Sequence, residues 1–522
     1  MLKIVIRVDA SIQIGVGHVM RCLTLAKELK KNGADVLFVC RDYPGHLQDV
    51  IQKKGFIVKL LLIPKTEYKK QENDPEYAPW LGVSWEQDVE ETKEFLGNEI
   101  VDWLIVDHYG IDFRWHDSFR RHTKNIMVID DLADRKLNCD VLLDQTYGRV
   151  KDAYASIVPE QSQLLLGTDY ALLRPEFVQL RLKAMEKRKK TMTIKRIVVS
   201  MGSMDPNNLT SQVLAGLTKV EWEEKPIVDV VLGSRAPKLK SVIDQSKGQI
   251  LDINILQDVE NMSELMLDAD LAIGAGGTTS WERCCLGLPS LLVQLAENQK
   301  QVIAELVKAG AARSISNSDI ENGIIRECND LQKNSIAMSE LSINALRIVN
   351  GQGAQLIAIR MKPDLAQDGS HVTIRNAYMS DADIIYQWQL DPNTRKYFHN
   401  AEKPQYEDHV DWLENKLAEP VSFFYIIEHN NNAAGVLRLD YQGITQNIVY
   451  IVSIYIAPDY YQQGLGATAL NYANLLFDEN ELHAEILEDN VASKKIFMRS
   501  GYIKDSEQNL YIKYPEQNGM VH

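Results

Sequence analysis

The fold is decided by an N-terminal stretch, Leu2-Lys-Ile-Val-Ile-Arg-Val-Asp-Ala-Ser-Ile-Gln-Ile-Gly-Val-Gly-His18, which runs directly into a helical pattern. Residues 2–8 are strand-like, and residues 20–31 repeat apolar side chains at helical spacing. A strand, a glycine-containing turn and a helix in this order indicate the first unit of a parallel sheet with helices on both faces.

The same alternation continues along the chain and restarts after a polar, basic stretch at 183–195. We expect strands in two successive groups, at 34–40, 103–106 and 126–129, then at 197–200, 228–232, 253–256, 271–273 and 290–293. From His371 onward the strands are longer, at 422–428, 434–441 and 448–456. The sequence therefore predicts an α/β protein with domains at 1–185 and 186–361, a linker at 362–370 and an α+β domain at 371–522.

Composition limits the class of protein. A chain of 522 residues is too long to fold around a single hydrophobic core. A content of 45% hydrophobic and 25% charged residues excludes a wholly disordered or fibrous chain. A net charge of −15 argues against a protein that coats nucleic acid. The six cysteines form no C-x-x-C pair, and no run of about 18 apolar residues occurs. We expect a soluble cytoplasmic protein with no membrane or nucleic-acid partner, no disulfide framework and no metal site.

Gly15, Gly17 and His18 stand directly before the first helix. Glycines let a ligand approach the backbone, a helix N-terminus favours negative charge, and histidine is a common general base. A histidine at a helix start without any chemistry explains the same pattern equally well. Asp107 and Asp131 follow two further strands, where aspartates often cap turns. Their expected convergence with His18 at one edge of the sheet is the feature that favours a functional site.

In the second α/β half, the stretch Gly274-Ala-Gly-Gly-Thr-Thr279 follows a strand and begins a helix. Its backbone N–H groups can hold a diphosphate, although it is neither a Walker A loop nor a dinucleotide fingerprint. Glu282 lies three residues after Thr279, so a capping box and hydrogen bonding to ribose hydroxyls both remain open.

Several motifs in order then carry a family resemblance: Arg7-Val-Asp-Ala-Ser11, Gly15-x-Gly-His-x-x-Arg21, Val106-Asp-x-Tyr109, Ile129-Asp-Asp-Leu-Ala-Asp-Arg135, Tyr170-Ala-Leu-Leu-Arg-Pro-Glu-Phe177, Gly202-Ser-Met-Asp-Pro206 and Gly276-Gly-Thr-Thr-Ser-Trp-Glu282. Residues 1–361 resemble the PseG family, the UDP-2,4-diacetamido-2,4,6-trideoxy-β-L-altropyranose hydrolases of pseudaminic acid synthesis. The resemblance implies a glycosyltransferase-B-like fold with UDP held by the second half, and a metal-independent, inverting hydrolysis with His18 as base. The UDP-sugar site that it implies comprises Arg7, Asp9, Gly15, Gly17, Arg21, Asp107, Tyr109, Asp131, Arg174, Gly202, Gly276, Gly277, Thr278, Thr279, Glu282, Asn298 and Gln299.

A second glycine-containing turn lies in the C-terminal domain. The strand at 452–456 runs into Gln462-Gln-Gly-Leu-Gly-Ala467, and a helical run follows. Together with Asn490-Val-Ala-Ser493 and Phe497, residues 371–515 resemble the GNAT N-acetyltransferases, in particular those acting on nucleotide-linked amino sugars such as the PseH family. The acetyl-CoA site that this implies comprises Ile454, Ile456, Gln462, Gln463, Gly464, Leu465, Gly466, Ala467, Asn490, Ser493 and Phe497.

Two positions depart from the GNAT pattern. Thr468 stands where the loop usually has Gly or Ala, and Phe497 stands where many relatives carry a tyrosine thought to protonate the departing thiolate. A phenyl ring cannot donate that proton, so Tyr461, Tyr502 and His483 become candidates.

The leading interpretation is a bifunctional enzyme that acetylates a UDP-4-amino-4,6-dideoxy sugar and then hydrolyses the UDP-diacetamido product. Two alternatives stay open: a glycosyltransferase with an appended acetyltransferase, and a nucleotide-sugar-binding scaffold with an inactive GNAT half. UDP-sugar and acetyl-CoA are the expected small-molecule partners.

Overall fold

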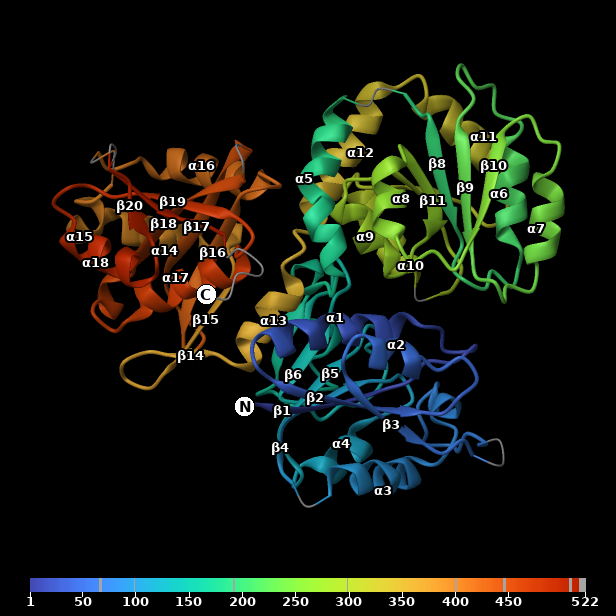
Figure 1. Ribbon diagram of the computed structural model, residues 1–522, viewed down its shortest axis with the longest axis horizontal. Coiled ribbons are helices and arrows are strands. Elements are labelled where there is room, and N and C mark those ends of the chain that lie inside the picture. The colour runs from blue at the N-terminus through green and yellow to red at the C-terminus, as the bar shows by residue number, and fades with distance from the viewer. Residues whose placement is uncertain are drawn as a thin grey trace. The chain divides into compact units, whose positions relative to one another are not determined.

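The structure is a computed structural model that describes the whole chain except residues 65–67, 98, 191–192, 298, 399, 401, 445–446, 507–508 and 516–522. It divides into two compact units, Met1–Ala354 and Gln355–His522 (Figure 1). None of the helices in the described part of the chain is both long enough and apolar enough to cross a membrane.

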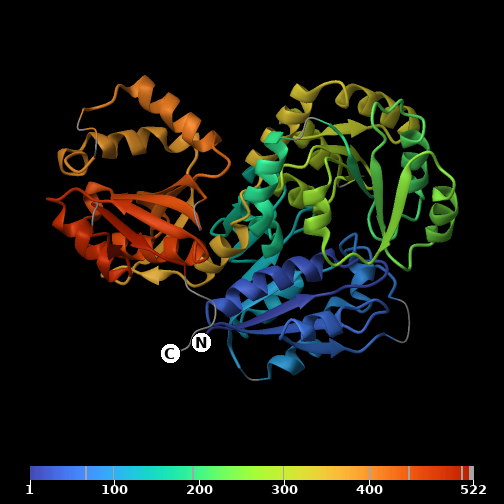
Figure 2. The same ribbon diagram turned by 45° about the horizontal axis from the view of Figure 1, so that its top comes forward.

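The first unit begins with a seven-stranded parallel sheet in the order β3-β2-β1-β4-β5-β6-β7. Its strands are β1 (Lys3–Val8), β2 (Asp35–Arg41), β3 (Ile57–Leu61), β4 (Val101–Asp107), β5 (Thr123–Ile129), β6 (Val141–Asp144) and β7 (Gln163–Leu166). Helices α1 (Gly17–Lys31) and α2 (Gln48–Lys53) cover one face, and α3 (Trp85–Leu96) and α4 (Phe113–Phe119) cover the other (Figures 1 and 2). The strand order reverses between β1 and β4, and ligands of open α/β sheets bind outside the carboxyl ends at such a point.

A second parallel sheet follows, with the order β10-β9-β8-β11-β12-β13 and its reversal between β8 and β11. Its strands are β8 (Arg196–Ser200), β9 (Ile227–Leu232), β10 (Asp252–Gln257), β11 (Leu271–Ala275), β12 (Ser290–Val293) and β13 (Arg313–Ile315). The accompanying helices are α5 (Pro175–Lys190), α6 (Leu209–Leu217), α7 (Leu239–Ser246), α8 (Met262–Asp268), α9 (Thr279–Cys285), α10 (Gln299–Lys308), α11 (Ile320–Leu331) and α12 (Ser335–Ile348).

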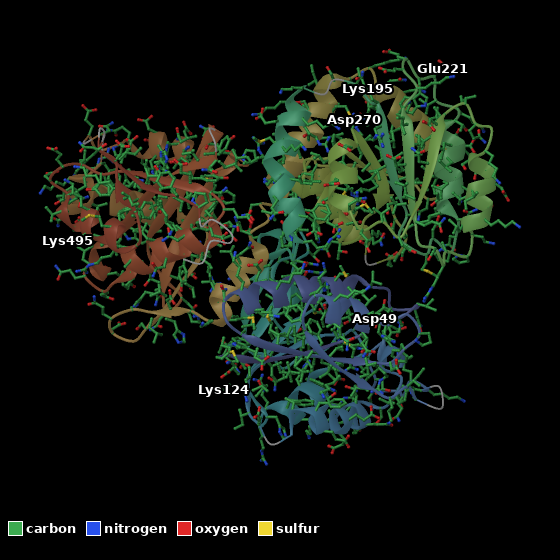
Figure 3. All side chains as sticks on the ribbon, viewed as in Figure 1. Asp49, Lys124, Lys195, Glu221, Asp270 and Lys495 are labelled. Carbon is green, nitrogen blue, oxygen red and sulfur yellow. The ribbon has the colours of Figure 1, made fainter. Side chains whose placement is uncertain are left out.

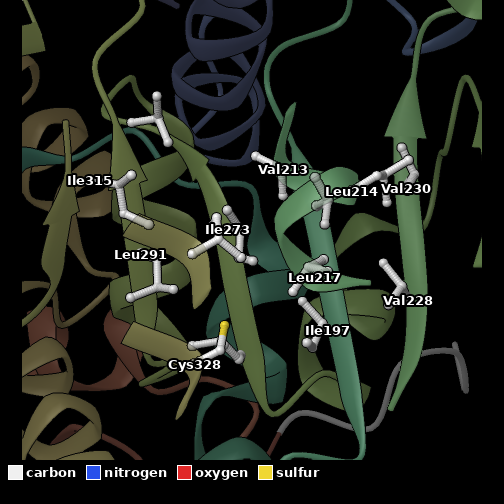
Figure 4. Packing of buried hydrophobic residues seen from close by; sticks show 14 of the residues in the cluster. Ile197, Val213, Leu214, Leu217, Val228, Val230, Ile273, Leu291, Ile315 and Cys328 are labelled. Carbon is white, nitrogen blue, oxygen red and sulfur yellow. The ribbon is translucent and has the colours of Figure 1, made fainter. Parts of the chain in front are cut away.

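The core of this second half lies between the sheet and its helices (Figure 4). Ile197, Val228 and Ile273 from three strands pack with Leu217 of α6 and Cys328 of α11, all essentially inaccessible to solvent. Burying each such aliphatic side chain contributes about 1.5–3 kcal/mol. All six cysteines are buried and free, so their thiols act as small apolar groups.

The second unit contains an eight-stranded sheet in the order β14-β15-β16-β17-β18-β19-β21-β20. Its strands are β14 (Asp364–Leu365), β15 (His371–Asn376), β16 (Phe423–His429), β17 (Asn432–Ile444), β18 (Ile448–Ile456), β19 (Glu481–Glu485), β20 (Ile503–Lys504) and β21 (Leu510–Lys513). The helices are α13 (Gly353–Met361), which begins in the last residues of the first unit, α14 (Ala382–Leu390), α15 (Pro392–Arg395), α16 (Tyr406–Ala418), α17 (Leu465–Leu476) and α18 (Val491–Arg499).

The neighbours of β18 differ along its length. β18 pairs with β17 from Ile448 to Ile456, but its parallel pairing with β19 covers only Val449 to Ile451. Within the described residues, the far part of β18, residues 452–456, therefore has a strand partner on one side only. Ile454 and Ile456 lie in this part of β18, so a ligand can pair with the strand edge that faces away from β17.

The predicted pair of Rossmann-like α/β halves followed by an α+β domain is confirmed. The structure differs in detail at two places. Helix α5 continues through the expected boundary between 185 and 186, and the expected linker at 362–370 contributes β14, where Asp364 pairs with Val372 and Leu365 with His371. Charged side chains, including Lys124 of the first unit and Lys495 of the second, lie on the outer surfaces (Figure 3).

Candidate active site

His18 lies at the start of α1, directly after β1, and its ring is held by Asp107 at the end of β4. His18 Nδ1 is 2.6 Å from Asp107 Oδ1. Arg21, one helical turn after His18, donates to the same carboxylate through Nε (2.7 Å) and Nη2 (2.6 Å). Asp107 is fully buried, whereas the His18 side chain is 11% exposed. A carboxylate on Nδ1 leaves Nε2 free to accept a proton, which is the arrangement of an oriented general base.

Burial alone would raise the pKa of Asp107, but the charge of Arg21 and the hydrogen bonds from Arg21 and His18 hold it far below the ordinary range. The carboxylate therefore stays ionised at neutral pH. An ionised carboxylate also stabilises the imidazolium that forms when His18 takes a proton.

Tyr109 and Asp131 complete the surroundings of His18. The Tyr109 hydroxyl donates to Asp131 Oδ1, and Arg21 Nη1 lies 3.3 Å from Asp131 Oδ2. The Tyr109 ring meets the His18 ring edge to face, with centroids 4.6 Å apart. Gly15 has φ +81°, and an added Cβ at Gly15 or Gly17 would meet open space. The structure thus brings together six residues that the sequence predicted for this edge: Gly15, Gly17, His18, Arg21, Asp107 and Tyr109, with Asp131 beside them.

Arg7 and Asp9 lie deeper in the sheet. Both side chains are fully buried, and Arg7 donates to Asp88 Oδ1 (3.1 Å), Asp88 Oδ2 (2.7 Å) and Asp9 Oδ1 (2.6 Å). Arg41 donates to Asp88 as well, at 2.8 Å. Arg7 and Asp9, which sequence reasoning assigned to substrate binding, therefore belong to an internal ion-pair network. This network holds the ends of β1 and β2 beneath the site.

In the second half, the loop 276–279 joins β11 to α9. Among the described residues, the backbone N–H groups of Gly277, Thr278 and Thr279 have no protein acceptor. An added Cβ at Gly276 would lie 2.5 Å from Ile303, and one at Gly277 would lie 3.8 Å from Gln299 Nε2. Gln299 Oε1 accepts from the N–H of Leu295 at 3.0 Å. The loop thus presents free N–H donors and lies next to the start of α10.

Glu282 does not cap α9. Its carboxylate pairs with Arg174, with Arg174 Nη2 3.1 Å from Glu282 Oε1, and burial raises the pKa of Glu282 although Arg174 opposes the shift. Gly202, which follows β8, has φ +84° and open space around its Cα. Asn298, also predicted for this site, lies outside the described residues.

In the second unit, the turn before α17 is rich in free donors. Gln462 and Gly464 have φ of +63° and +86°, which turns successive N–H groups outward. Within the described part of the chain, the N–H groups of Gln462, Gln463, Gly464, Leu465 and Gly466 have no protein acceptor. Ala467 already donates to the Gly464 carbonyl. A nest of this kind suits a pyrophosphate at a helix N-terminus.

The neighbouring helix α18 carries the remaining predicted acetyl-CoA residues. Asn490 caps it, because its Oδ1 accepts from the N–H of Ser493 at 3.1 Å. Phe497 is buried and packs edge to face against Tyr502, with ring centroids 4.9 Å apart. The Tyr502 hydroxyl is buried and has no hydrogen-bond partner among the residues that the structure describes, and burial raises its pKa. By contrast, Tyr461 bonds to Thr394 (2.7 Å) and His483 to Glu481 (2.6 Å).

Two family models match the chain. Residues 196–358 match the glycosyltransferase family 28 C-terminal domain, and residues 382–502 match the acetyltransferase (GNAT) family. The chain joins a glycosyltransferase-like part to a GNAT acetyltransferase domain. The loop 276–279 lies in the glycosyltransferase-like part, and the turn 462–466 lies in the GNAT domain.

Curated relatives extend this picture. An uncharacterized protein of Methanocaldococcus jannaschii is 25% identical over 520 residues, which cover 96% of this chain and 97% of the relative. The UDP-2,4-diacetamido-2,4,6-trideoxy-β-L-altropyranose hydrolase of Campylobacter jejuni is 27% identical over 310 residues, covering 59% of this chain and 97% of that protein. The spore coat polysaccharide biosynthesis protein SpsG of Bacillus subtilis is 23% identical, covering 58% of this chain and 80% of its own. The predicted resemblance to a PseG-like part followed by a GNAT domain is confirmed.

Sequence reasoning missed an aromatic pair beside Tyr109, the residue that packs on His18. Tyr77 and Trp80 meet edge to face with centroids 4.6 Å apart, and Trp80 stacks on Tyr109 at 5.8 Å. It also missed Arg149, whose Nη2 donates to the Asp131 carbonyl at 2.7 Å. The signal for the pair was the aromatic content of Tyr77-Ala-Pro-Trp80 within an otherwise polar stretch.

Proposed function

We propose that the protein is a bifunctional enzyme of UDP-sugar metabolism. The GNAT domain transfers an acetyl group from acetyl-CoA to the amine of a UDP-4-amino-4,6-dideoxy sugar. The PseG-like part then hydrolyses the product, UDP-2,4-diacetamido-2,4,6-trideoxy-β-L-altropyranose, to UDP and the free sugar, as in pseudaminic acid synthesis. The observation that carries the proposal is the His18–Asp107–Arg21 cluster at the carboxyl edge of the first sheet, within the region similar to the hydrolase of Campylobacter jejuni.

In the hydrolysis, a water attacks the anomeric carbon while His18 Nε2 takes one of its protons. The bond between the anomeric carbon and the UDP oxygen breaks, and its electron pair leaves with UDP, so the configuration inverts. Asp107 orients the ring and offsets the charge that His18 gains. The free N–H groups at Gly277, Thr278 and Thr279 are the donors available for the diphosphate that leaves.

In the acetyl transfer, acetyl-CoA supplies the activated acetyl group. The five unpaired N–H groups of residues 462–466 are the donors for its pyrophosphate, and the open side of β18 at Ile454 and Ile456 suits its extended arm. Phe497 gives no proton to the departing thiolate. Tyr502, the candidate in contact with Phe497, carries the unpartnered hydroxyl that fits this role.

The test of the hydrolase is His18→Ala. We expect loss of UDP release from the UDP-diacetamido sugar, with the Kd for UDP unchanged because the loop 276–279 is untouched. Undiminished hydrolysis by His18→Ala would remove His18 from the role of base. NMR of the products would report the anomeric configuration, and release of free thiol from acetyl-CoA in the presence of the amino sugar would report the transferase.

The match of residues 196–358 to a glycosyltransferase domain favours a second candidate, transfer of the sugar to an acceptor other than water. UDP release from the substrate in the absence of any acceptor separates the two reactions. A PseG-like hydrolase releases UDP at its full rate under these conditions, whereas a transferase does not.

A further inference from the structure

A buried guanidinium lies against the loop 276–279 of the PseG-like part. Arg283, on α9, is 3% exposed. Its Nη2 donates to the carbonyl of Ala275 at 2.6 Å and to Ser280 Oγ at 2.9 Å. Ala275 ends β11 and Ser280 lies in the first turn of α9. Arg283 therefore ties the two ends of the loop together.

Gly274 makes room for this arginine. An added Cβ at Gly274 would lie 2.2 Å from Arg283 Nη1 and 2.8 Å from the carbonyl oxygen of Ser200. Because neither neighbour can retreat without losing its place, only glycine fits here. The first glycine of the Gly274–Thr279 motif thus leaves space for the buried Arg283 side chain, while the following residues form the loop 276–279.

The charge of Arg283 is only partly offset, by the charge of the neighbouring Glu282. No carboxylate in the described part of the chain lies within ion-pair distance of Arg283, and its Nε has no hydrogen-bond partner. The adjacent Glu282 is engaged by Arg174 instead. Burial lowers the pKa of Arg283 to about 10, so the side chain still carries its charge at neutral pH. A buried charge is costly unless an opposite charge approaches it.

We propose that Arg283 is a positioning residue that provides the positive charge for the diphosphate of a uridine nucleotide bound at loop 276–279, acting from behind the loop. The inference rests on the proposed function, since that function places UDP at this loop. Arg283 fixes the loop through Ala275 and Ser280, and its field strengthens the attraction of the free N–H groups for an anion. Arg283 should therefore affect the affinity for the phosphates and not the affinity for the uridine.

The experiment compares the affinities of the full-length protein for UDP and for uridine by calorimetry. For Arg283→Gln we expect the Kd for UDP to rise about tenfold or more, while the Kd for uridine changes less than about threefold. Arg283→Lys keeps a charge at the same place and should retain the preference for UDP to within about threefold. The dependence of UDP affinity on salt should weaken in Arg283→Gln and not in Arg283→Lys.

Arg188→Gln is the matched control. Arg188 is also buried in the same half, donates to the carbonyls of Leu286, Ala269 and Met266 at 2.7–3.1 Å, and has its pKa lowered to about 10 by burial. Its substitution should leave the ratio of UDP to uridine affinity unchanged, because Arg188 bonds to carbonyls at the C-terminal ends of α8 and α9 and not to the loop at the start of α9.

Two results overturn the inference: an unchanged UDP-to-uridine ratio in folded Arg283→Gln, or loss of the preference in folded Arg283→Lys. If Arg283→Gln does not fold, Arg283→Lys decides alone. Wild-type protein that binds no UDP contradicts the proposed function itself, whereas wild-type binding with an insensitive Arg283→Gln contradicts only the role of Arg283.

Discussion

Asp107→Asn tests the proposed base most sharply, because it changes the proton on His18 without changing the size of its partner. The Asp107 carboxylate receives His18 Nδ1 at 2.6 Å and Arg21 Nε and Nη2 at 2.7 and 2.6 Å. An asparagine has one acceptor oxygen, so it keeps only one of the two Arg21 donors, which reach different oxygens of the carboxylate. With that oxygen facing Arg21 Nε, the amide nitrogen takes the place of Oδ1. The amide NH₂ then faces His18 Nδ1 and forces the proton onto Nε2, where it blocks acceptance of a proton from water.

The expected loss in kcat for UDP release is about 10³- to 10⁴-fold, the effect of holding a catalytic histidine in the wrong tautomer. This corresponds to about 4–5.5 kcal/mol of transition-state stabilisation. Arg21 also loses a buried ion pair, which costs about 3–5 kcal/mol of folding free energy. The assay therefore runs well below the measured Tm of the variant, with UDP binding as a check that the nucleotide half is intact.

Asp102→Asn is the matched control, since Asp102 is on the same strand, β4, at the opposite end. Asp102 bonds to the exposed Lys124 at 2.8 Å and to the N–H of Lys3 at 2.8 Å. The same substitution there should change kcat less than about twofold, because an exposed ion pair contributes about 0–1 kcal/mol to stability and nothing to His18. A folded Asp107→Asn enzyme that retains kcat within tenfold of wild type would refute the assignment of His18 as a base oriented by Asp107.

Three further outcomes are expected. Gly464→Val should raise the KM for acetyl-CoA in the thiol-release assay, because valine disfavours the φ of +86° that turns the neighbouring N–H groups outward. Gly369→Val is the control: Gly369 has φ +83° in open space, so the variant should lose similar stability without that change in KM. Arg7→Met should lower the free energy of unfolding by about 3–5 kcal/mol in urea titrations, because it breaks the buried ion pairs of Arg7 with Asp9 and Asp88 and leaves Asp88 paired with Arg41. A loss below about 1 kcal/mol would contradict the network. Acid should destabilise the first unit. Burial opposes ionisation of Asp9 and Asp107, but neighbouring arginines hold their pKa values far below the unfolded value of about 3.9. The stability that these carboxylates contribute is therefore full above about pH 5 and declines as the pH falls below about 4. Equal unfolding free energies at about pH 5 and about pH 3 would speak against this.

Much of the fold could be predicted from apolar periodicity because the long central strands are buried on both faces. The strand expected at 448–456 is found at Ile448–Ile456, and that at 2–8 at Lys3–Val8. Short strands such as β6 and β13 escaped prediction, since four or three residues are too few to show a period. The two-residue β14 lay inside the predicted linker for the same reason.

The candidate site was predictable where its residues follow strands or begin helices. His18, Asp107 and Asp131 meet because parallel strands end at one edge of a sheet. The internal roles of Arg7 and Asp9 were not predictable, because Arg7 also pairs with Asp88 of α3, 81 residues away along the chain. A motif reports which residues occur near a site, but burial decides whether a side chain faces the ligand or the core.

The two glycine-rich turns show why a motif alone does not explain its glycines. In the GNAT domain, Gly464 is required by its own backbone, since its positive φ directs the neighbouring N–H groups outward. In the PseG-like part, Gly274 is required by space for Arg283. Substitution at Gly464 should therefore alter ligand affinity by reorienting donors, whereas substitution at Gly274 should do so by displacing a charge.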